Sequence, residues 1–264
     1  MKDNLADIRA TIAVPAGKSY MLRTCDSQMR AHMLWGGFVW PRSGPVEAPD
    51  WSPADQCGRG LHGLLMGEGL GSLLSWEPDA VWLVVEIDAV DVVVITADGG
   101  GKIKVPRGNV VYAGDRAGAC AYLMERGADA AKMVGGTVSA GDGGTASAGY
   151  RGTASAGDRG TASAGDGGTA SVGDRGTASA GDRGTASAGY GGDLSFRWWD
   201  GAASRHRRTV AYVGEGGILP HTLYRAGPSG IPEMVRALRS EEYPDAVNAR
   251  LRAASAAKIA GGSK

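Results

Sequence analysis

Residues 177–184 read Thr-Ala-Ser-Ala-Gly-Asp-Arg-Gly, and the next eight residues repeat this phrase with two changes, as Thr-Ala-Ser-Ala-Gly-Tyr-Gly-Gly. Seven such octads fill residues 137–192 without a slip, beginning at Thr137, Thr145, Thr153, Thr161, Thr169, Thr177 and Thr185. A flexible Gly/Ser/Ala linker has no need of a strict phase. A fixed period instead indicates a repeat architecture, in which each repeat stacks on the next.

The chemistry of one octad predicts a β-solenoid. Side chains of an extended Thr-Ala-Ser-Ala alternate between two faces, so the hydroxyls share one face and the two methyl groups share the other. The Gly-Asp-Arg-Gly that follows supplies residues suited to a tight corner. Two octads would therefore close a flattened coil of sixteen residues, with alanines in a thin core and hydroxyls facing water.

Equivalent residues of such a coil stack every sixteen positions, about 4.8 Å apart. One outer face would then carry the threonines of the first, third, fifth and seventh octads, and the other face those of the second, fourth and sixth. With the serines two positions on, these hydroxyls are our candidate binding residues: Thr137, Thr145, Thr153, Thr161, Thr169, Thr177, Thr185, Ser147, Ser155, Ser163, Ser171 and Ser179. At the corners, Asp142, Asp158 and Asp174 would form an acidic column.

The predicted fold class is mainly β, in three parts. Residues 1–134 predict an α+β module, with strands expected at 19–24, 81–87, 91–95 and 101–113 and a helix over 115–127. Residues 135–192 form the octapeptide β-solenoid. Residues 193–264 predict a small β cap with a helical tail: Leu194 and Phe196 replace alanines and would close the core, and the pattern from 231 to 260 is helical.

Composition excludes several classes of function. The 28 basic and 28 acidic residues cancel, so nucleic acid is an unlikely partner. Three widely spaced cysteines fit neither a disulfide framework nor a thiolate site, and the four histidines lack ligand spacing, so we expect no metal and no cofactor. With no apparent signal peptide and no apolar span, we expect a cytoplasmic protein that makes no membrane contact.

The octads resemble the repeats of bacterial ice-nucleation proteins in period, in the Ala-Gly-[Tyr or Asp]-x-Gly corner and in a hydroxyl pair spaced by two. The resemblance covers residues 137–192 and implies ice binding through the Thr-x-Ser faces as one candidate function. The pair is Thr-x-Ser here rather than Thr-x-Thr. The two tyrosines, Tyr150 and Tyr190, are forty residues apart, whereas a stacked ladder requires multiples of sixteen.

The layout of the whole chain is similar to a family of phage and bacterial proteins. In that family a Cys-x-x-Gly-[Leu/Phe]-His module, here residues 57–62, precedes a small-residue octad array and a short Trp-containing β tail, here residues 196–199. The resemblance implies our primary interpretation, a non-enzymatic structural or binding protein of phage or prophage type. Its solenoid would be a rigid spacer or a self-association surface, and its partner another protein or a second copy of the chain.

An enzyme is the remaining alternative. Residues 58–69 read Gly-Arg-Gly-Leu-His-Gly-Leu-Leu-Met-Gly-Glu-Gly, which resembles the Gly-x-Gly-[Ile/Leu]-[Tyr/His] loop of ADP-ribosyltransferase folds. The resemblance implies an NAD-using site around residues 58–68, with His62 or Glu68 in substrate orientation or acid–base work. In the structural alternative the glycines form a tight connection and His62 is a satisfied structural residue.

Overall fold

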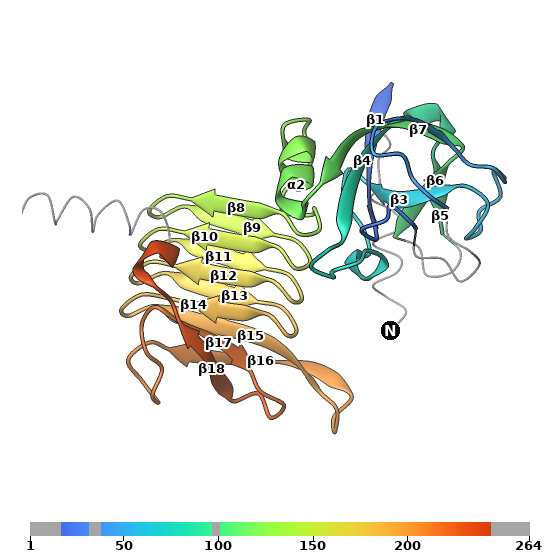
Figure 1. Cartoon of the computed structure of the whole chain (residues 1–264). Helices are drawn as coiled ribbons and strands as arrows, with labels where there is room; N and C mark the ends of the chain where they lie inside the picture. The colour runs from blue at the N-terminus through green and yellow to red at the C-terminus, as the bar shows by residue number, and fades with distance from the viewer. Residues whose placement is uncertain (1–16, 32–37, 97–100, 244–264) are drawn as a thin grey trace, which may run out of the picture. The chain divides into compact units, whose positions relative to one another are not determined.

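The computed structural model describes residues 17–31, 38–96 and 101–243 of the 264-residue chain. The chain divides into two compact units, Met1–Val134 and Gly135–Lys264 (Figure 1). The solenoid and the strands that follow it therefore belong to the same unit.

An antiparallel sheet of seven strands forms the first unit (Figure 1). Across the sheet the strands are β2 (Gly44–Glu47), β7 (Arg107–Gly114), β4 (Val81–Asp88), β1 (Lys18–Cys25), β3 (Leu61–Leu65), β6 (Lys102–Val105) and β5 (Val93–Ile95). Helix α2 (Arg116–Met124) lies near β4 and β7, and Asp115 caps it by accepting a hydrogen bond from the Gly118 backbone N–H at 2.7 Å. Two 3-10 turns, η1 (Gly71–Leu73) and η2 (Ala89–Asp91), connect strands.

The expected strands and helix of this unit are confirmed, but β2 and β3 were not predicted. Strand β3 lies in the stretch that resembles a glycine loop. Its Gly63 lies against the neighbouring strand β1. A Cβ added there would lie 2.4 Å from the Met21 Cγ atom and 2.6 Å from the Leu22 carbonyl oxygen. The glycine therefore permits close packing within a strand, and its presence in the sequence does not mark a loop.

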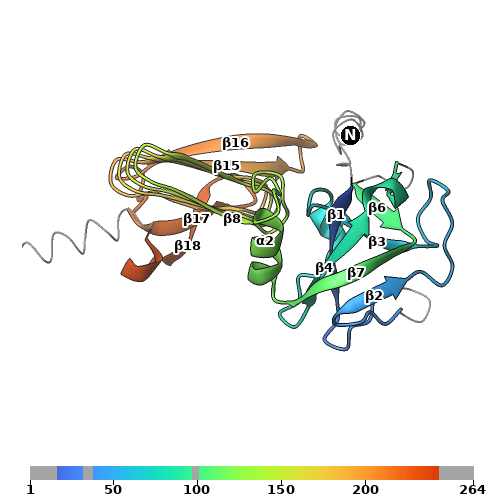
Figure 2. The same cartoon turned by 90° about the horizontal axis from the view of Figure 1, so that it is seen from above.

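The octads form a β-solenoid, as the sequence predicts. Each contributes one strand: β8 (Thr137–Ala140), β9 (Thr145–Ala148), β10 (Thr153–Ala156), β11 (Thr161–Ala164), β12 (Thr169–Val172), β13 (Thr177–Ala180) and β14 (Thr185–Ser187). Thr153 pairs in parallel with both Thr137 and Thr169, and Thr161 with Thr145 and Thr177. One coil is therefore sixteen residues, and Figure 2, which looks along the stack, shows its flattened outline.

Alanine methyl groups fill the space between the two solenoid sheets. The second residue of every octad from Ala146 to Ala186 is 0 % exposed. At the corners, the seventh residue of all seven octads has a positive φ: Gly143, Arg151, Arg159, Gly167, Arg175, Arg183 and Gly191. Four arginines thus adopt the left-handed conformation that glycine takes more easily. The eighth residue is always glycine, because a Cβ there would crowd the Cβ atom of the fourth residue of the same octad and, from Gly152 onward, also a carbonyl oxygen of the preceding coil.

Larger side chains close one end of this core. Strand β15 (Asp193–Asp200) continues the register, with Leu194 beside Ala178 and Phe196 beside Ala180, and both larger side chains are buried. The predicted cap is confirmed at these two residues. The polarity then reverses: β16 (Arg205–Tyr212) runs antiparallel to β15, and β17 (Thr222–Ala226) antiparallel to β14.

The predicted helical tail is wrong over its first part. Residues Pro232–Ala237 form strand β18, antiparallel to β17, and Ser240–Glu242 form the 3-10 turn η3. Residues 244–264 lie outside the described residues. Pro232 is compatible with the start of a helix and equally with the start of an edge strand, where its missing N–H costs no ladder bond. Pairing with the preceding strand β17, in a hairpin whose connection is residues 227–231, decided between the two.

Replacing Gly168 by alanine tests the corner packing. A Cβ at this position would lie 2.7 Å from the Gly152 carbonyl oxygen and 2.9 Å from the Ala164 Cβ atom. We expect Gly168→Ala to lower the free energy of unfolding by about 1–3 kcal/mol, the usual cost of overpacking. Gly141, where an added Cβ meets nothing within 4 Å, supplies the control. Gly141→Ala should stay within about 0.5 kcal/mol of the parent in chemical denaturation, and equal losses would contradict the packing argument.

Candidate functional site

The structure arranges the candidate hydroxyls in two separate arrays. Face I is the outer surface of β8, β10, β12 and β14, and face II is that of β9, β11 and β13. On face II the in-register pairing stacks Thr145, Thr161 and Thr177 in one column. A parallel column holds Ser147, Ser163 and Ser179. All six residues are exposed or half-buried, so this face presents an ordered array of hydroxyls to solvent.

Face I is partly covered. In Figures 1 and 2 the segment from β18 to η3 lies over the outside of this sheet. Ser187 and Ser171 are only 1 % and 8 % exposed, and their hydroxyls are 3.1 Å apart, as are those of Thr169 and Thr185. Hydroxyls that bond to one another under a covering segment are less available to a ligand than those of face II.

Two further serines belong to the columns of face I. Ser139 and Ser187 occupy the third position of the first and last octads, and they pair in register with their neighbours Ser155 and Ser171. Neither serine was among the predicted binding residues. The octad phase alone identifies them, because each lies two residues after a column threonine.

The acidic corner column is confirmed, and it has a structural role. Asp158 donates its backbone N–H to the Asp142 carboxylate at 3.0 Å, and Asp174 does the same to Asp158 at 2.9 Å. Tyr190 in turn donates its backbone N–H to the Asp174 carboxylate at 2.8 Å, which extends this ladder of hydrogen bonds by one coil. At the other corner, Asp182 donates to Asp166 at 2.9 Å. The carboxylates thus accept the corner N–H groups of the next coil, which the strand ladder leaves unpaired.

A pair of substitutions at Asp174 tests this ladder. Asp174→Ala removes the acceptor of the Tyr190 N–H and should lower the free energy of unfolding by about 1 kcal/mol. Asp174→Asn keeps a side-chain oxygen in place, so we expect it to retain most of that stability. Thermal unfolding of the two variants checks the difference, and an asparagine variant as unstable as the alanine variant would show that the charge matters more than the acceptor.

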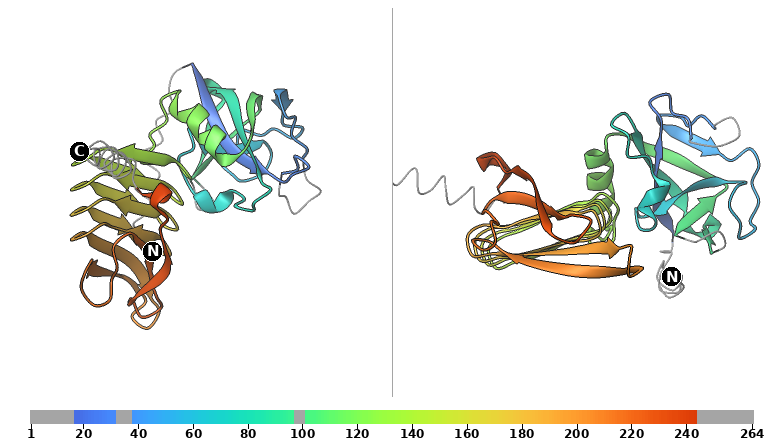
Figure 3. Two further views of the ribbon diagram at one scale, coloured as in Figure 1. Left: turned by 60° about the vertical axis from the view of Figure 1, so that its left-hand side comes forward. Right: turned by 90° about the horizontal axis from the view of Figure 1, so that it is seen from below.

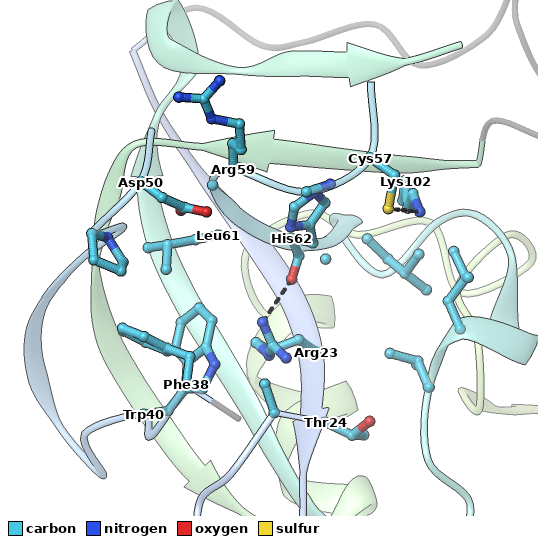
Figure 4. Close-up of a pocket in the computed structure, with 18 residues that line it drawn as sticks. Arg23, Thr24, Phe38, Trp40, Asp50, Cys57, Arg59, Leu61, His62 and Lys102 are labelled. Carbon is cyan, nitrogen blue, oxygen red and sulfur yellow. Dashed lines mark hydrogen bonds between the residues drawn. The ribbon is translucent and has the colours of Figure 1, made fainter. Parts of the chain in front are cut away.

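The first unit contains a cavity of about 470 Å³ beside strands β1 and β3 (Figure 4). Phe38, Trp40 and Leu61 supply apolar surface, and further leucines line the wall. The charged residues of the wall are Arg23, Asp50, Arg59 and Lys102. His62 projects into the same region, between Arg23 and the Cys57–Lys102 pair in Figure 4. The cavity therefore has an apolar wall and a surplus of basic groups.

His62 holds the glycine-rich loop in place. Its Nε2 atom accepts a hydrogen bond from the Gly58 backbone N–H at 3.2 Å, and its carbonyl oxygen accepts one from the Arg23 Nη1 at 3.1 Å. Burial, together with the positive charges of Lys102, Arg23 and Lys104, lowers the pKa of His62 to about 4, although a backbone hydrogen bond with Gly60 acts in the opposite direction. The ring is thus neutral at pH 7, and these contacts match the structural interpretation of this histidine.

Glu68 does not belong to the described residues that line the cavity, and its backbone forms an isolated bridge with Met133. Burial raises the pKa of the Glu68 carboxyl group above its ordinary value. The two residues implied by the ADP-ribosyltransferase resemblance are therefore not assembled into one site. Arg23 and Trp40, which do meet in the cavity, were not identified from the sequence.

Two kinds of feature are absent from residues 17–31, 38–96 and 101–243. No cluster of three or more His, Cys, Asp or Glu side chains in this part of the chain could hold a metal ion. None of the helices described there has the length and apolarity needed to cross a membrane.

The sixteen-residue strand register and the stacked hydroxyls of the second unit are those of a β-solenoid built from repeats. The chain is 38 % identical over 122 residues to an ice nucleation protein of Pseudomonas syringae pv. syringae. It is 39 % identical over 112 residues to ice nucleation protein InaU of Pantoea ananas, and 42 % identical over 106 residues to an ice nucleation protein of Xanthomonas campestris pv. translucens. These matches cover 46, 42 and 40 % of the chain.

The chain spans only about a tenth of the length of these relatives, or less: 10, 10 and 6 %, in the same order. No protein-family model matches the sequence. No solved structure matches it either.

These relatives contradict the primary interpretation of the sequence. A phage-type structural protein, with the solenoid as spacer or self-association surface, predicts no particular similarity to ice nucleation proteins. The matches found are to such proteins and favour the ice-binding alternative. The error arose because the layout of the chain was given more weight than the chemistry of the octads.

The depressed pKa of His62 makes the stability of the first unit pH-dependent. Between pH 6.5 and about 4 the unfolded chain binds a proton that the folded chain does not. This contribution to stability is therefore complete above pH 6.5 and is lost as the pH falls toward 4. The slope of the unfolding free energy against pH reports the number of protons taken up on unfolding. We expect His62→Gln to lower that number by up to about one in this window. Urea unfolding of the full chain across the window tests this, and identical slopes would contradict it.

Proposed function

We propose that the solenoid binds ice through face II. The observation that carries the proposal is the in-register stacking of Thr145, Thr161 and Thr177 beside Ser147, Ser163 and Ser179. The spacing along each column is set by backbone hydrogen bonds between strands, at about 4.8 Å. Similarity to ice nucleation proteins over 40–46 % of the chain supports the same function.

Rigidity is what makes such an array useful. Ordering water or binding a crystal surface demands that hydroxyls hold fixed positions, since each mobile group would lose conformational entropy on binding. Here the threonine and serine backbones are paired on both sides in the middle strand β11. The alanines behind them are buried and leave no room for movement. The array is thus held in its binding geometry before ice arrives.

The size of face II limits what it does. Three strands carry its solvent-facing hydroxyl columns. In the next strand, β15, Asp193 takes the place of a threonine beside Thr177, and Ser195, which continues the serine column beside Ser179, is only 8 % exposed. A template must exceed the size of a critical ice embryo to nucleate freezing, whereas a crystal already present needs only a local contact. We therefore propose that face II binds ice that has already formed.

Substitution in the centre of each face tests the proposal. Thr161→Lys places a long hydrated side chain in the middle of face II and should raise the protein concentration needed to inhibit ice recrystallisation by about tenfold. Thr153→Lys is the matched control, because Thr153 holds the same octad position on the partly covered face I. We expect it to retain activity.

Three results would overturn the proposal. The parent chain could fail to inhibit recrystallisation, the two lysine variants could lose activity equally, or Thr161→Lys could keep full activity. Circular dichroism of both variants establishes that the solenoid remains folded in each comparison.

Location and partners stay predictions. The sequence predicts a cytoplasmic protein whose partner is another protein or a second copy of the chain, and the proposed ice binding depends on neither. The resemblance of residues 57–62 to a module of phage and bacterial proteins also stays a prediction.

A further inference from the structure

The cavity of the first unit has an excess of positive charge. Arg23, Arg59 and Lys102 line it, whereas Asp50 is its only acidic residue among those described. None of the three basic groups has a carboxylate within ion-pair distance in the described part of the chain. Because basic and acidic residues balance in the chain as a whole, this excess is local to the cavity.

Arg23 is the most constrained of these groups. Its guanidinium carbon lies 4.1 Å from the centre of the Trp40 ring, and one terminal nitrogen donates to the His62 carbonyl oxygen. Its Nε atom is buried and has no hydrogen-bond partner among the described residues. A buried guanidinium without a carboxylate is costly for a fold, since burial penalises its charge. The planar fork of arginine also matches the oxygens of a carboxylate or phosphate.

Lys102 supplies a second basic group to the wall of the cavity. The Lys102 Nζ atom is 2.9 Å from the Cys57 sulfur, and Figure 4 shows this pair across from Asp50 and Arg59. The buried Lys104 stands behind the same loop and donates to the Gln56 carbonyl oxygen at 2.9 Å. The low pKa of His62 reflects the positive potential of Lys102, Arg23 and Lys104 as well as burial.

The remaining wall suits an apolar or planar body. Phe38 and Trp40 pack edge to face, with ring centres 5.5 Å apart, and Leu61 and Leu64 lie nearby in the wall. A volume of about 470 Å³ falls within the range of small-molecule sites, which combine apolar walls with a few polar groups. Aromatic surface and paired basic groups in one cavity are complementary to a molecule that has a ring and an anionic group.

We propose that this cavity binds a small organic anion, whose planar ring packs against Phe38 and whose carboxylate or phosphate is held by Arg23 and Lys102. The site lies wholly in the first unit and is independent of ice binding by the solenoid. It requires no covalent chemistry and does not involve Glu68.

Calorimetric titration of the full chain with four probes tests the proposal. Indole-3-acetate and adenosine 5′-monophosphate each carry a ring and an anion, and indole-3-ethanol and adenosine are their neutral counterparts. We expect saturable binding of at least one anionic probe, with its neutral counterpart at least about tenfold weaker. The probe that binds identifies whether the anionic group is a carboxylate or a phosphate. Binding should also raise the pKa of His62, measured by NMR, because the anion offsets the neighbouring positive charges.

Three variants locate the site. Arg23→Gln and Lys102→Gln should each weaken binding of the anionic probe by about tenfold. Arg107→Gln is the matched control, since Arg107 is an exposed arginine of the same sheet that pairs with Asp91 outside the cavity. It should bind within about twofold of the parent. If Arg23→Gln does not fold, Lys102→Gln decides the comparison.

Several results would overturn the proposal: no saturable binding of either anionic probe, equal binding of a neutral counterpart, or equal loss in Arg107→Gln and Lys102→Gln.

Discussion

The close approach of the two solenoid sheets is the constraint on which the second unit depends. Small side chains fill the space between them: Ala154, Ala162 and Ala170 are completely buried there, and Val172 is the largest residue that an octad buries in it. At the corners the packing is equally close, because a Cβ at Gly168 would lie 2.7 Å from the Gly152 carbonyl oxygen of the neighbouring coil. The sixteen-residue coil, the in-register columns and the flat outer faces all follow from this thin core, because small side chains allow each coil to repeat the last.

The fold was predictable where local chemistry repeats and unpredictable where distant segments meet. The octads contain their own strand, corner and register, and Leu194 and Phe196 mark the end of the core by size alone. Strand β18 was predicted as helix because Pro232 suits the start of either element, and the turn signal Gly-Pro-Ser-Gly at residues 227–230, which joins it to β17 in a hairpin, was given too little weight. Strand β3 was missed because its Gly63 is required by Met21, more than forty residues earlier in the chain.

The candidate sites divide in the same way. The hydroxyl columns follow from the octad phase, but the difference between the two faces arises from a segment that returns over face I after β18 (Figure 3, left). In the first unit, His62 was visible as a polar residue in a glycine-rich stretch. Arg23 was one basic residue within a strand, and only folding stacks it on Trp40 and beside the His62 carbonyl. A cavity assembled from separate strands leaves no contiguous motif in the sequence.

The reversal of strand polarity after β15 has a consequence for how such an array can grow. Antiparallel β16 and β17 end the stack, so new coils can arise only by duplication within residues 137–192. Duplicating two octads would add one whole turn and leave Leu194 and Phe196 under the same sheet. Duplicating a single octad would transfer β15 to the sheet of face I. The exposed face II and the partly covered face I would then exchange their positions relative to the cap. The number of octads in this architecture can therefore increase, but the cap keeps its place only when octads are added in pairs.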